Sequence, residues 1–413
     1  MKVLISAYAC ETGRGGEGEI SWRLVHRLAS YHDVYVITRA NLRATHQAAF
    51  LVSPKPERLH FIYFDLPWIF RFYKRKKRLF LVYYYLWQLG VGIIARKIVK
   101  EREIDILHHL IGGMDWMPAG LSLAPGPLIW GPVGSENTHS LMKSKLPLPS
   151  RIKDNCRSFA RCLMRTLDPL VRLSAMRASV ILSHTPETMP KRYHPKLVPF
   201  VQTGIENTSY LAHAKTDLTR LSCLRLIFAG ELKDWKGASL ALDSALRFFE
   251  QEDEATLVII GDGPLRASME AKAYSHKHGN RVKFLGKVPM ETLVKELHMA
   301  DVFLYPSFHH GMATVVLQAM LTGLPIVCIE GDAIGRAIGQ TGGITVQLAK
   351  DRDPVDDLAG ALLHLASNET LRQSLASTAR EMAHQNFSYD HQALALAKIY
   401  EKVADKFENL GSL

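Results

Sequence analysis

The sequence predicts an α/β protein with two doubly wound domains, each built on a parallel sheet. Short runs of consecutive apolar residues alternate along the chain with longer segments of helical periodicity. Such runs are typical of parallel strands that helices cover on both faces. The length of 413 residues suits two domains, and a polar stretch at 207–220 separates two series of strands. We therefore expect a first domain at 1–205, a second at 206–388 and a further segment at 389–413.

The apolar runs give the expected strands of each domain. In the first domain they lie at Val3–Ala7, Val34–Thr38, Ile104–His108, Leu128–Trp130, Val180–Ser183 and Leu197–Val201. In the second they lie at Leu224–Ala229, Thr256–Ile260, Val282–Leu285, Val302–Tyr305, Ile326–Ile329 and 342–346. Helices are expected between them, among others at 19–30, 238–249, 290–299, 313–321, 354–366, 369–385 and 390–407.

The chain carries 51 Lys and Arg against 40 Asp and Glu, a net charge of +11. This balance favours anionic partners such as phosphates or an acidic membrane surface. No DNA- or RNA-binding motif is present, so we expect no nucleic-acid partner. Five scattered cysteines without metal-binding spacing are typical of a reduced, cytoplasmic protein. The chain enters its first strand directly after Met1, so we expect no signal peptide.

Residues 67–95 form a basic and aromatic stretch. Five consecutive Lys and Arg residues at 74–78 follow several aromatic residues, and the run at 79–95 is uncharged. One interpretation is a buried helix with a solvated basic cap, and the other is a surface that rests on an anionic membrane. A transmembrane helix is the weakest interpretation, because the run is short and contains Gln88 and three tyrosines. Residues 142–177, basic with apolar residues at helical spacing, leave the same two alternatives.

The stretch 300–332 carries the most specific motif. A strand leads into Pro306-Ser307 and a loop through His309, and a helix, a Gly-Leu-Pro break and a second strand follow. In such a unit the loop lies at the carboxyl edge of the sheet beside a helix N-terminus, where open α/β sheets bind anionic ligands. This order of residues resembles the nucleotide-sugar signature of retaining GT-B glycosyltransferases, specifically family 4.

The resemblance implies a GT-B fold, in which two doubly wound Rossmann-like domains face an interdomain cleft and a last helix crosses back to the first domain. It also implies transfer of a hexose from a UDP- or GDP-sugar to a hydroxyl of a glycan or lipid-linked glycan, with no metal or other cofactor. Such an enzyme of bacterial cell-surface polysaccharide or glycolipid synthesis would be peripheral at the inner face of the cell membrane.

The family pattern also implies roles for individual residues. Lys236 would neutralise the leaving diphosphate, and either His108 or His109, at the end of a strand, would face the transferred sugar. The donor is expected at Arg14, Gly15, Gly16, Glu231, Gly261, Lys287, Val288, His310, Gly311, Met312, Ala313, Thr314 and Gln318. The acceptor side is expected at Gly131, Gly134 and Glu136. For the glycine-rich loops a plain tight turn is the alternative.

Three positions depart from the family pattern. His310 and Gln318 stand where relatives carry glutamates, and Glu231 stands where they carry an arginine. Gln318 can still accept one hydrogen bond from a ribose hydroxyl and donate another. A carboxylate at Glu231 would repel a diphosphate unless it is paired or turned away. Two alternatives follow: a non-catalytic relative that binds a nucleotide sugar or a partner enzyme, and a sugar-nucleotide epimerase, for which the site is poor in acidic groups.

Overall fold

The structure is a computed structural model that describes residues 1–13, 16–70, 79–110, 113–134, 140–143, 147–206, 223–308, 313–330, 333–339 and 341–411. It divides into two compact units. Unit 1 comprises residues 1–135, 156–202 and 389–413, and unit 2 comprises 136–155 and 203–388. The described residues 140–143 and 147–155 belong to unit 2, although the sequence analysis placed them in the first domain.

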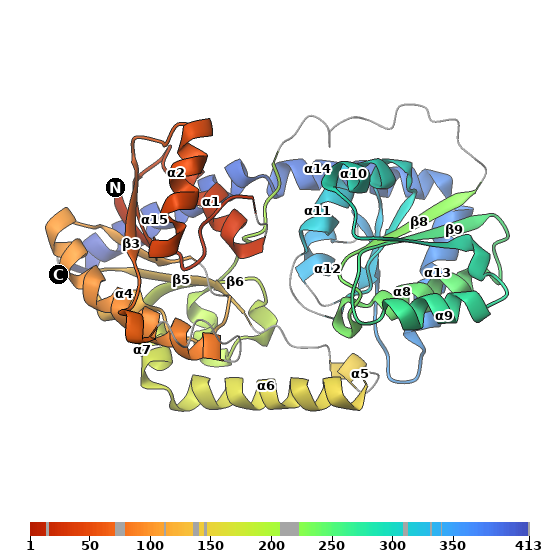
Figure 1. The fold of residues 1–413 in the computed structure, drawn as a ribbon, viewed down its shortest axis with the longest axis horizontal. Coiled ribbons are helices and arrows are strands. Elements are labelled where there is room, and N and C mark those ends of the chain that lie inside the picture. Colours follow the sequence, from red (N-terminus) through yellow and green to blue (C-terminus); the bar gives the residue numbers. More distant parts are fainter. Residues whose placement is uncertain are drawn as a thin grey trace. The chain divides into compact units, whose positions relative to one another are not determined.

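Unit 1 contains a seven-stranded parallel sheet of order β3-β2-β1-β4-β5-β6-β7 (Figure 1). Its strands are β1 (Lys2–Ser6), β2 (Asp33–Arg39), β3 (Leu59–Phe64), β4 (Ile106–His109), β5 (Leu128–Val133), β6 (Ala178–Ser183) and β7 (Leu197–Pro199). The sequence analysis missed β3. This edge strand is mostly half-buried, so it lacks the continuous apolar run by which the central strands were found.

Helices cover both faces of this sheet. They are α1 (Gly16–Leu28), α2 (Arg43–Val52), α4 (Phe80–Arg102), α7 (Pro169–Arg177) and α15 (Tyr389–Gly411). A further helix, α6 (Leu148–Leu167), lies between β5 and α7 in the sequence. Residues 148–155 of α6 belong to unit 2 and its remainder to unit 1. Short 3-10 turns lie at η1 (Ala40–Leu42), η2 (Trp68–Phe70), η4 (Gly120–Leu123), η5 (Pro186–Thr188) and η6 (Lys191–Lys196).

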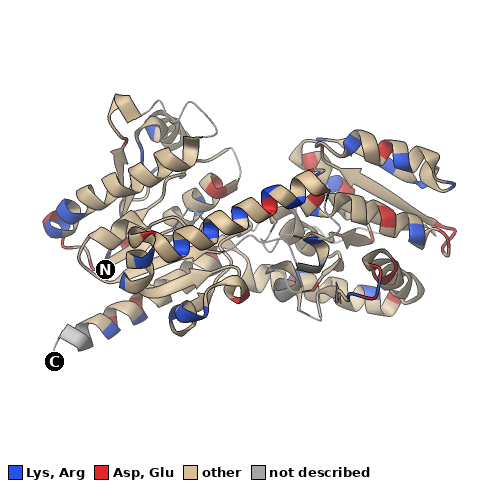
Figure 2. Ribbon diagram, turned by 90° about the horizontal axis from the view of Figure 1, so that it is seen from below, with Lys and Arg blue, Asp and Glu red and all other residues tan. Residues whose placement is uncertain are grey.

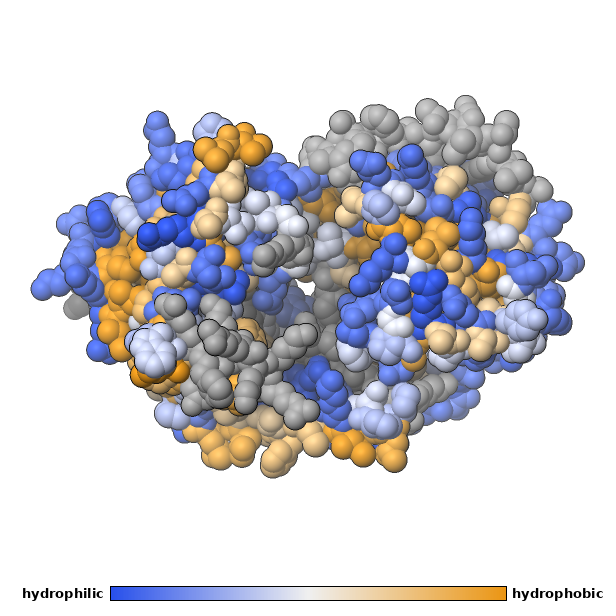
Figure 3. All heavy atoms as spheres, in the orientation of Figure 1, coloured by the Kyte–Doolittle hydropathy of each residue, from blue (hydrophilic) through white to orange (hydrophobic). Residues whose placement is uncertain are grey.

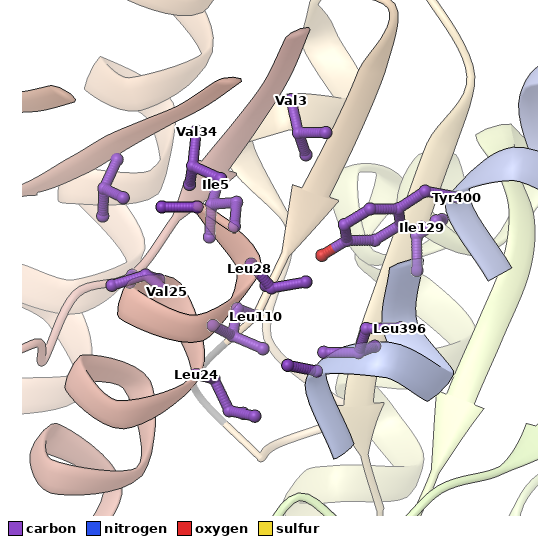
Figure 4. Packing of buried hydrophobic residues seen from close by; sticks show 14 of the residues in the cluster. Val3, Ile5, Leu24, Val25, Leu28, Val34, Leu110, Ile129, Leu396 and Tyr400 are labelled. Atoms are coloured by element: carbon purple, nitrogen blue, oxygen red, sulfur yellow. The ribbon is translucent and has the colours of Figure 1, made fainter. Parts of the chain in front are cut away.

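Two hydrophobic clusters form on opposite faces of β1, β4 and β5. On one face, Leu24 and Leu28 of α1 and Leu396 and Tyr400 of α15 pack against Ile5 (Figure 4). On the other face α4 packs against the alternate residues of the same strands. This arrangement follows from the alternation of side chains along a strand. The chain's last helix thus completes the core of its first sheet.

Unit 2 contains a six-stranded parallel sheet of order β10-β9-β8-β11-β12-β13. Its strands are β8 (Leu224–Ala229), β9 (Ala255–Ile260), β10 (Val282–Gly286), β11 (Val302–Leu304), β12 (Ile326–Ile329) and β13 (Gly343–Val346). The helices are α5 (Ser140–Lys143), α8 (Ala238–Phe248), α9 (Arg266–Ser275), α10 (Met290–Met299), α11 (Thr314–Leu321), α12 (Ala333–Ile338), α13 (Pro354–Ser367) and α14 (Glu369–Asn386), with 3-10 turns η7 (Asp234–Lys236) and η8 (Gly279–Arg281).

Both sheets therefore have doubly wound, Rossmann-like topology, as predicted. The order reverses between β1 and β4 in unit 1 and between β8 and β11 in unit 2. In open sheets of this kind, ligands bind at the carboxyl ends of the strands beside that reversal point. Among the described residues, no helix combines the length and apolar character needed to span a bilayer.

Candidate functional site

In unit 2 the loops after β8 and β11 meet at the reversal point of the sheet. The amide of Phe308 donates a hydrogen bond of 2.9 Å to the carbonyl of Trp235. The Ser307 hydroxyl donates to the same carbonyl at 3.3 Å. The Pro-Ser motif of the sequence thus fixes the loop that carries Lys236. Sequence reasoning did not identify the part played by Trp235, because a backbone carbonyl acceptor leaves no mark in residue type.

Gly237 allows these two loops to approach closely. Its φ of +72° lies in the left-handed region, and a Cβ added there would lie 1.9 Å from the carbonyl oxygen of Pro306. Helix α8 begins at the next residue, and no described side chain caps its N-terminus. The amides of a first helical turn that lacks a side-chain cap form an anion-binding site.

Glu231, the residue that departs from the family pattern, is paired. Its Oε1 lies 2.5 Å from Nζ of Lys233, and that Nζ stands 5.0 Å from the centre of the Trp235 ring. Both side chains are partly exposed, so the pair contributes little to stability. The pairing places a cation beside the Glu231 carboxylate, which reduces the repulsion between this carboxylate and an anionic ligand. Half-buried Lys236 lies in η7, just before α8.

The loops after β8, β9 and β10 are held together through their backbones. Gly261, with φ +130°, donates its amide to the carbonyl of Gly286 at 2.8 Å, and Leu232 donates to Asp262 at 3.0 Å. A Cβ on Gly261 would lie 1.8 Å from the carbonyl oxygen of Gly230. Gly261 is therefore required for close packing of the loops that surround the candidate site.

Gln318 lies on α11, the helix after the β11 loop. It is 9% exposed, and its Nε2 donates to Sδ of Met290 at 3.3 Å. Met290 begins α10, two residues after Val288, so Gln318 lies near the turn that carries Lys287 and Val288. The hydrogen bond to Met290 was not predicted, because a thioether partner is uncommon for an amide. At the start of α11, Ala313 is half-buried and Thr314 is exposed.

In unit 1 the adjacent residues His108 and His109 end strand β4 and point to opposite faces of the sheet. His108 is fully buried on the α15 side. Its Nε2 donates to the carbonyl of Gly131 at 2.7 Å, and its Nδ1 accepts from the Tyr400 hydroxyl at 2.6 Å. Burial lowers the pKa of His108 to about 4, so the ring is neutral. Both of its nitrogens are engaged by protein groups.

His109 lies on the α4 side of the sheet, 3% exposed. Its Nε2 stands 3.5 Å from the hydroxyl of Tyr84, and its buried Nδ1 has no hydrogen-bond partner among the described residues. Burial, together with the neighbouring His108, lowers the pKa of His109 to about 3. The two alternatives that the sequence left open therefore differ, because only His109 keeps a ring nitrogen without a described protein partner.

The glycines expected in an acceptor-side loop lie instead in packed structure. β5 extends through Val133, so Gly131 is a buried strand residue, and a Cβ there would lie 2.3 Å from the carbonyl oxygen of Leu182. A Cβ on Gly134 would lie 2.4 Å from Oγ1 of Thr185. The loop prediction is corrected for Gly131, which lies within β5, whereas Gly134 follows the end of the strand. Both are small because neighbouring segments approach them, and their acceptor-side role stays a prediction.

Gly16 is the one residue of the Arg14–Gly16 loop prediction that the structure describes. It begins α1, three residues earlier than expected, with φ +66°. Glu19 holds the preceding loop, because its Oε2 accepts from the amide of Gly13 at 2.6 Å and its Oε1 lies 2.7 Å from Nε of Arg23. The remaining site predictions lie outside the described residues: Arg14, Gly15, Glu136, His310, Gly311 and Met312. No cluster of three or more potential metal ligands occurs among the residues that the structure describes.

Comparison with known proteins relates unit 2 to glycosyltransferases. Residues 223–382 match the family described as "Glycosyl transferases group 1". The 2-deoxystreptamine glucosyltransferase of Streptomyces kanamyceticus is 28% identical over 180 residues, 43% of this chain and 46% of that protein. The amylovoran biosynthesis glycosyltransferase AmsK of Erwinia amylovora is 28% identical over 44% of this chain and 45% of its own length. The chain thus spans just under half the length of the curated relatives it matches.

Solved structures resemble the chain over nearly its whole length. A glycosyltransferase from Rickettsia africae has a TM-score of 0.63 at 12% identity, covering 97% of this chain and 98% of its own. Anabaena HepE in complex with UDP has a TM-score of 0.59 at 14% identity, covering 97% of this chain and 100% of its own. These likenesses confirm the predicted fold of two Rossmann-like domains, as found in GT-B glycosyltransferases.

Proposed function

We propose that the protein is a retaining, metal-independent glycosyltransferase of family 4 that moves a hexose from a UDP- or GDP-sugar to a hydroxyl of a glycan or lipid-linked glycan. The observation that carries the proposal is the junction after β8, where Lys236 precedes the uncapped N-terminus of α8. A lysine beside helical amides that no described side chain caps suits a nucleoside diphosphate, whose negative charge grows as the sugar departs. The family match at 223–382 includes this junction.

In the proposed reaction the bond from the sugar C1 to the diphosphate oxygen breaks, and a bond from C1 to the acceptor oxygen forms on the same face. The departing phosphate oxygen takes the acceptor proton, so the products are the glycoside and the nucleoside diphosphate. Lys236 stabilises the charge on that oxygen. His109, neutral over the physiological pH range, contacts the transferred sugar as the resemblance implies. Lys233 offsets the carboxylate of Glu231.

The donor is tested by calorimetric titration of the purified protein with UDP, GDP and their common sugar conjugates. We expect micromolar binding of one base series, with and without EDTA. Incubation of the bound conjugate should then release free sugar slowly, and an acceptor should accelerate its consumption. Failure of every nucleotide to bind to folded protein would overturn the proposal.

The amide at position 318 gives a sharper test of the donor orientation. If Gln318 contacts the ribose, Gln318→Glu should tighten nucleotide binding, because a carboxylate makes stronger hydrogen bonds with hydroxyl groups than an amide does. Gln373→Glu on α14, where the amide bonds Glu369 at 2.9 Å, is the matched control. Equal affinities for the Gln318→Glu variant and the unaltered protein would exclude this contact.

A non-catalytic relative is the second candidate, and the neutral Gln318 packed against Met290 favours it. Such a protein would bind a nucleotide sugar without consuming it, so donor turnover separates the two candidates.

We further propose that residues 67–95 bring the protein to the inner face of an anionic membrane, where a lipid-linked acceptor resides. Trp68 is 80% exposed and Ile69 is 54% exposed on η2, which suits insertion at a membrane surface. The basic run 74–78 lies outside the described residues.

A further inference from the structure

Helix α6 exposes its apolar face. Its large apolar residues recur at spacings of four and seven, which places them on one side of the helix. Five of them are exposed, Leu148 by 59%, Ile152 by 53%, Phe159 by 71%, Leu163 by 44% and Leu167 by 68%, and Met164 is half-buried. Figure 3 shows this face as an apolar band along the lower edge of the view, where Figure 1 places α6. A helix that only packed on its own domain would bury such a stripe.

The opposite side of α6 is charged and buried. Asp154 is 9% exposed and lies 3.2 Å from Nζ of Lys143. Arg165 forms an ion pair with fully buried Asp115, and its carbonyl accepts from Nη2 of Arg192 at 2.7 Å. These contacts fix the rotation of the helix about its own axis, so the apolar stripe cannot turn inward without breaking buried ion pairs.

The charges beside the stripe are of one sign. Arg151 and Lys153 are exposed, whereas Asp154, the one acidic residue of α6, is buried. On the following helix α7, Met176 is 72% exposed between exposed Arg172 and Arg177. Figure 2, seen from below, shows lysines and arginines spread along these helices. A second copy of the chain would bring like charges together, whereas anionic lipid headgroups would complement them.

We propose that the outward face of α6 inserts into the boundary between headgroups and acyl chains of an anionic bilayer. The stripe supplies the apolar contact, and Arg151 and Lys153 meet the acidic headgroups. This surface is separate from residues 67–95 and extends the membrane association proposed above. It requires neither nucleotide binding nor transfer, so it can stand even if the transferase assignment fails.

The test is flotation of the full-length protein with vesicles of phosphatidylcholine, with or without phosphatidylglycerol. We expect binding to the anionic vesicles, weakened by salt, and about a tenfold loss of partitioning in the double variant Phe159→Ser, Leu163→Ser. The matched control is Leu51→Ser, Val52→Ser at the end of α2, where both side chains are 89% exposed. The control should bind like the unaltered protein. Circular dichroism and the melting temperature check that each variant is folded.

Three other outcomes would overturn the proposal. Equal binding of the α6 variant and the control would show that the stripe does not touch lipid. Loss of binding confined to Trp68→Ser, Ile69→Ser would assign membrane contact to residues 67–95 alone. A dimer that the α6 substitutions dissociate without changing vesicle binding would identify a second copy as the occupant. As a gain of signal, a tryptophan introduced by Phe159→Trp should be quenched by brominated lipid, and no quenching would exclude insertion.

Discussion

The same topological position is positively charged in unit 2 and neutral in unit 1. At the reversal point of unit 2, a loop shaped by Gly237 carries Lys236 and leads into a helix N-terminus that no described side chain caps. At that of unit 1, strand β4 ends in two buried histidines whose pKa values lie at about 4 and about 3. One position suits an anion, and the other offers neutral hydrogen-bonding groups. Shared topology therefore says where a ligand can bind, and the local side chains say of what kind.

The largest effect on stability is expected from a substitution at Gly237. Gly237→Val should lower the free energy of unfolding of unit 2 by about 4 kcal/mol, because the side chain would meet the Pro306 carbonyl and the backbone would be strained. Nucleotide binding should be lost with it. Gly360→Ala in α13 is the control, since a Cβ there meets nothing within 4 Å and helix propensity should rise. Urea unfolding measures both, and a stable Gly237→Val variant would contradict the close approach.

The neutral histidines of unit 1 predict acid sensitivity. The pKa of His108 is depressed in the folded state, so the unfolded chain binds the proton more readily below its own value of about 6.5. Stability should therefore fall by about 3 kcal/mol as pH drops from about 6.5 to about 4.

The variant His108→Gln should be less stable at neutral pH but show a shallower pH dependence, measured by urea unfolding across this range. The control His391→Gln, at an exposed position of α15, should keep the slope of the unaltered protein. An unchanged slope in His108→Gln would mean that this histidine does not titrate on unfolding.

The positive charge of Lys236 can be removed to test its role in the reaction without disturbing the packing of unit 2. Lys236→Ala should lower kcat by about 100-fold while leaving the melting temperature nearly unchanged, because it removes a donor to the leaving group. Lys402→Ala, an exposed lysine of α15, removes the same charge elsewhere. Equal rates for the two variants would remove Lys236 from the reaction.

The smallest effect on stability is expected at Tyr400 in unit 1. Tyr400→Phe deletes the hydroxyl that donates to Nδ1 of His108 and should cost about 1 kcal/mol of unfolding free energy. Tyr274→Phe, at a side chain that is 94% exposed, should cost nothing measurable. Thermal unfolding of the two variants should differ accordingly, and matching transitions would show that the buried hydrogen bond is worth little.

Sequence reasoning recovered the central strands because their apolar runs are continuous. It missed β3, where edge burial removes that pattern. The resemblance to the family pattern pointed to Lys236 and Gly237, and the structure shows that Gly237 has a positive φ. The sequence could not separate His108 from His109, because strand alternation gives opposite faces without saying which helix covers each. Gly131 was predicted to lie in a loop, whereas the structure shows a strand residue whose lack of a side chain lets the backbone of a neighbouring strand approach closely.

The hydrogen bond between His108 and Tyr400 joins residues 292 positions apart in the sequence. The core of unit 1 closes only when α15 packs against its sheet, whereas every strand of unit 2 has by then left the ribosome. Unit 2 can therefore fold during translation, while unit 1 must wait as an incomplete sheet with one apolar face uncovered. Until α15 packs, that uncovered apolar face makes the nascent chain prone to aggregate.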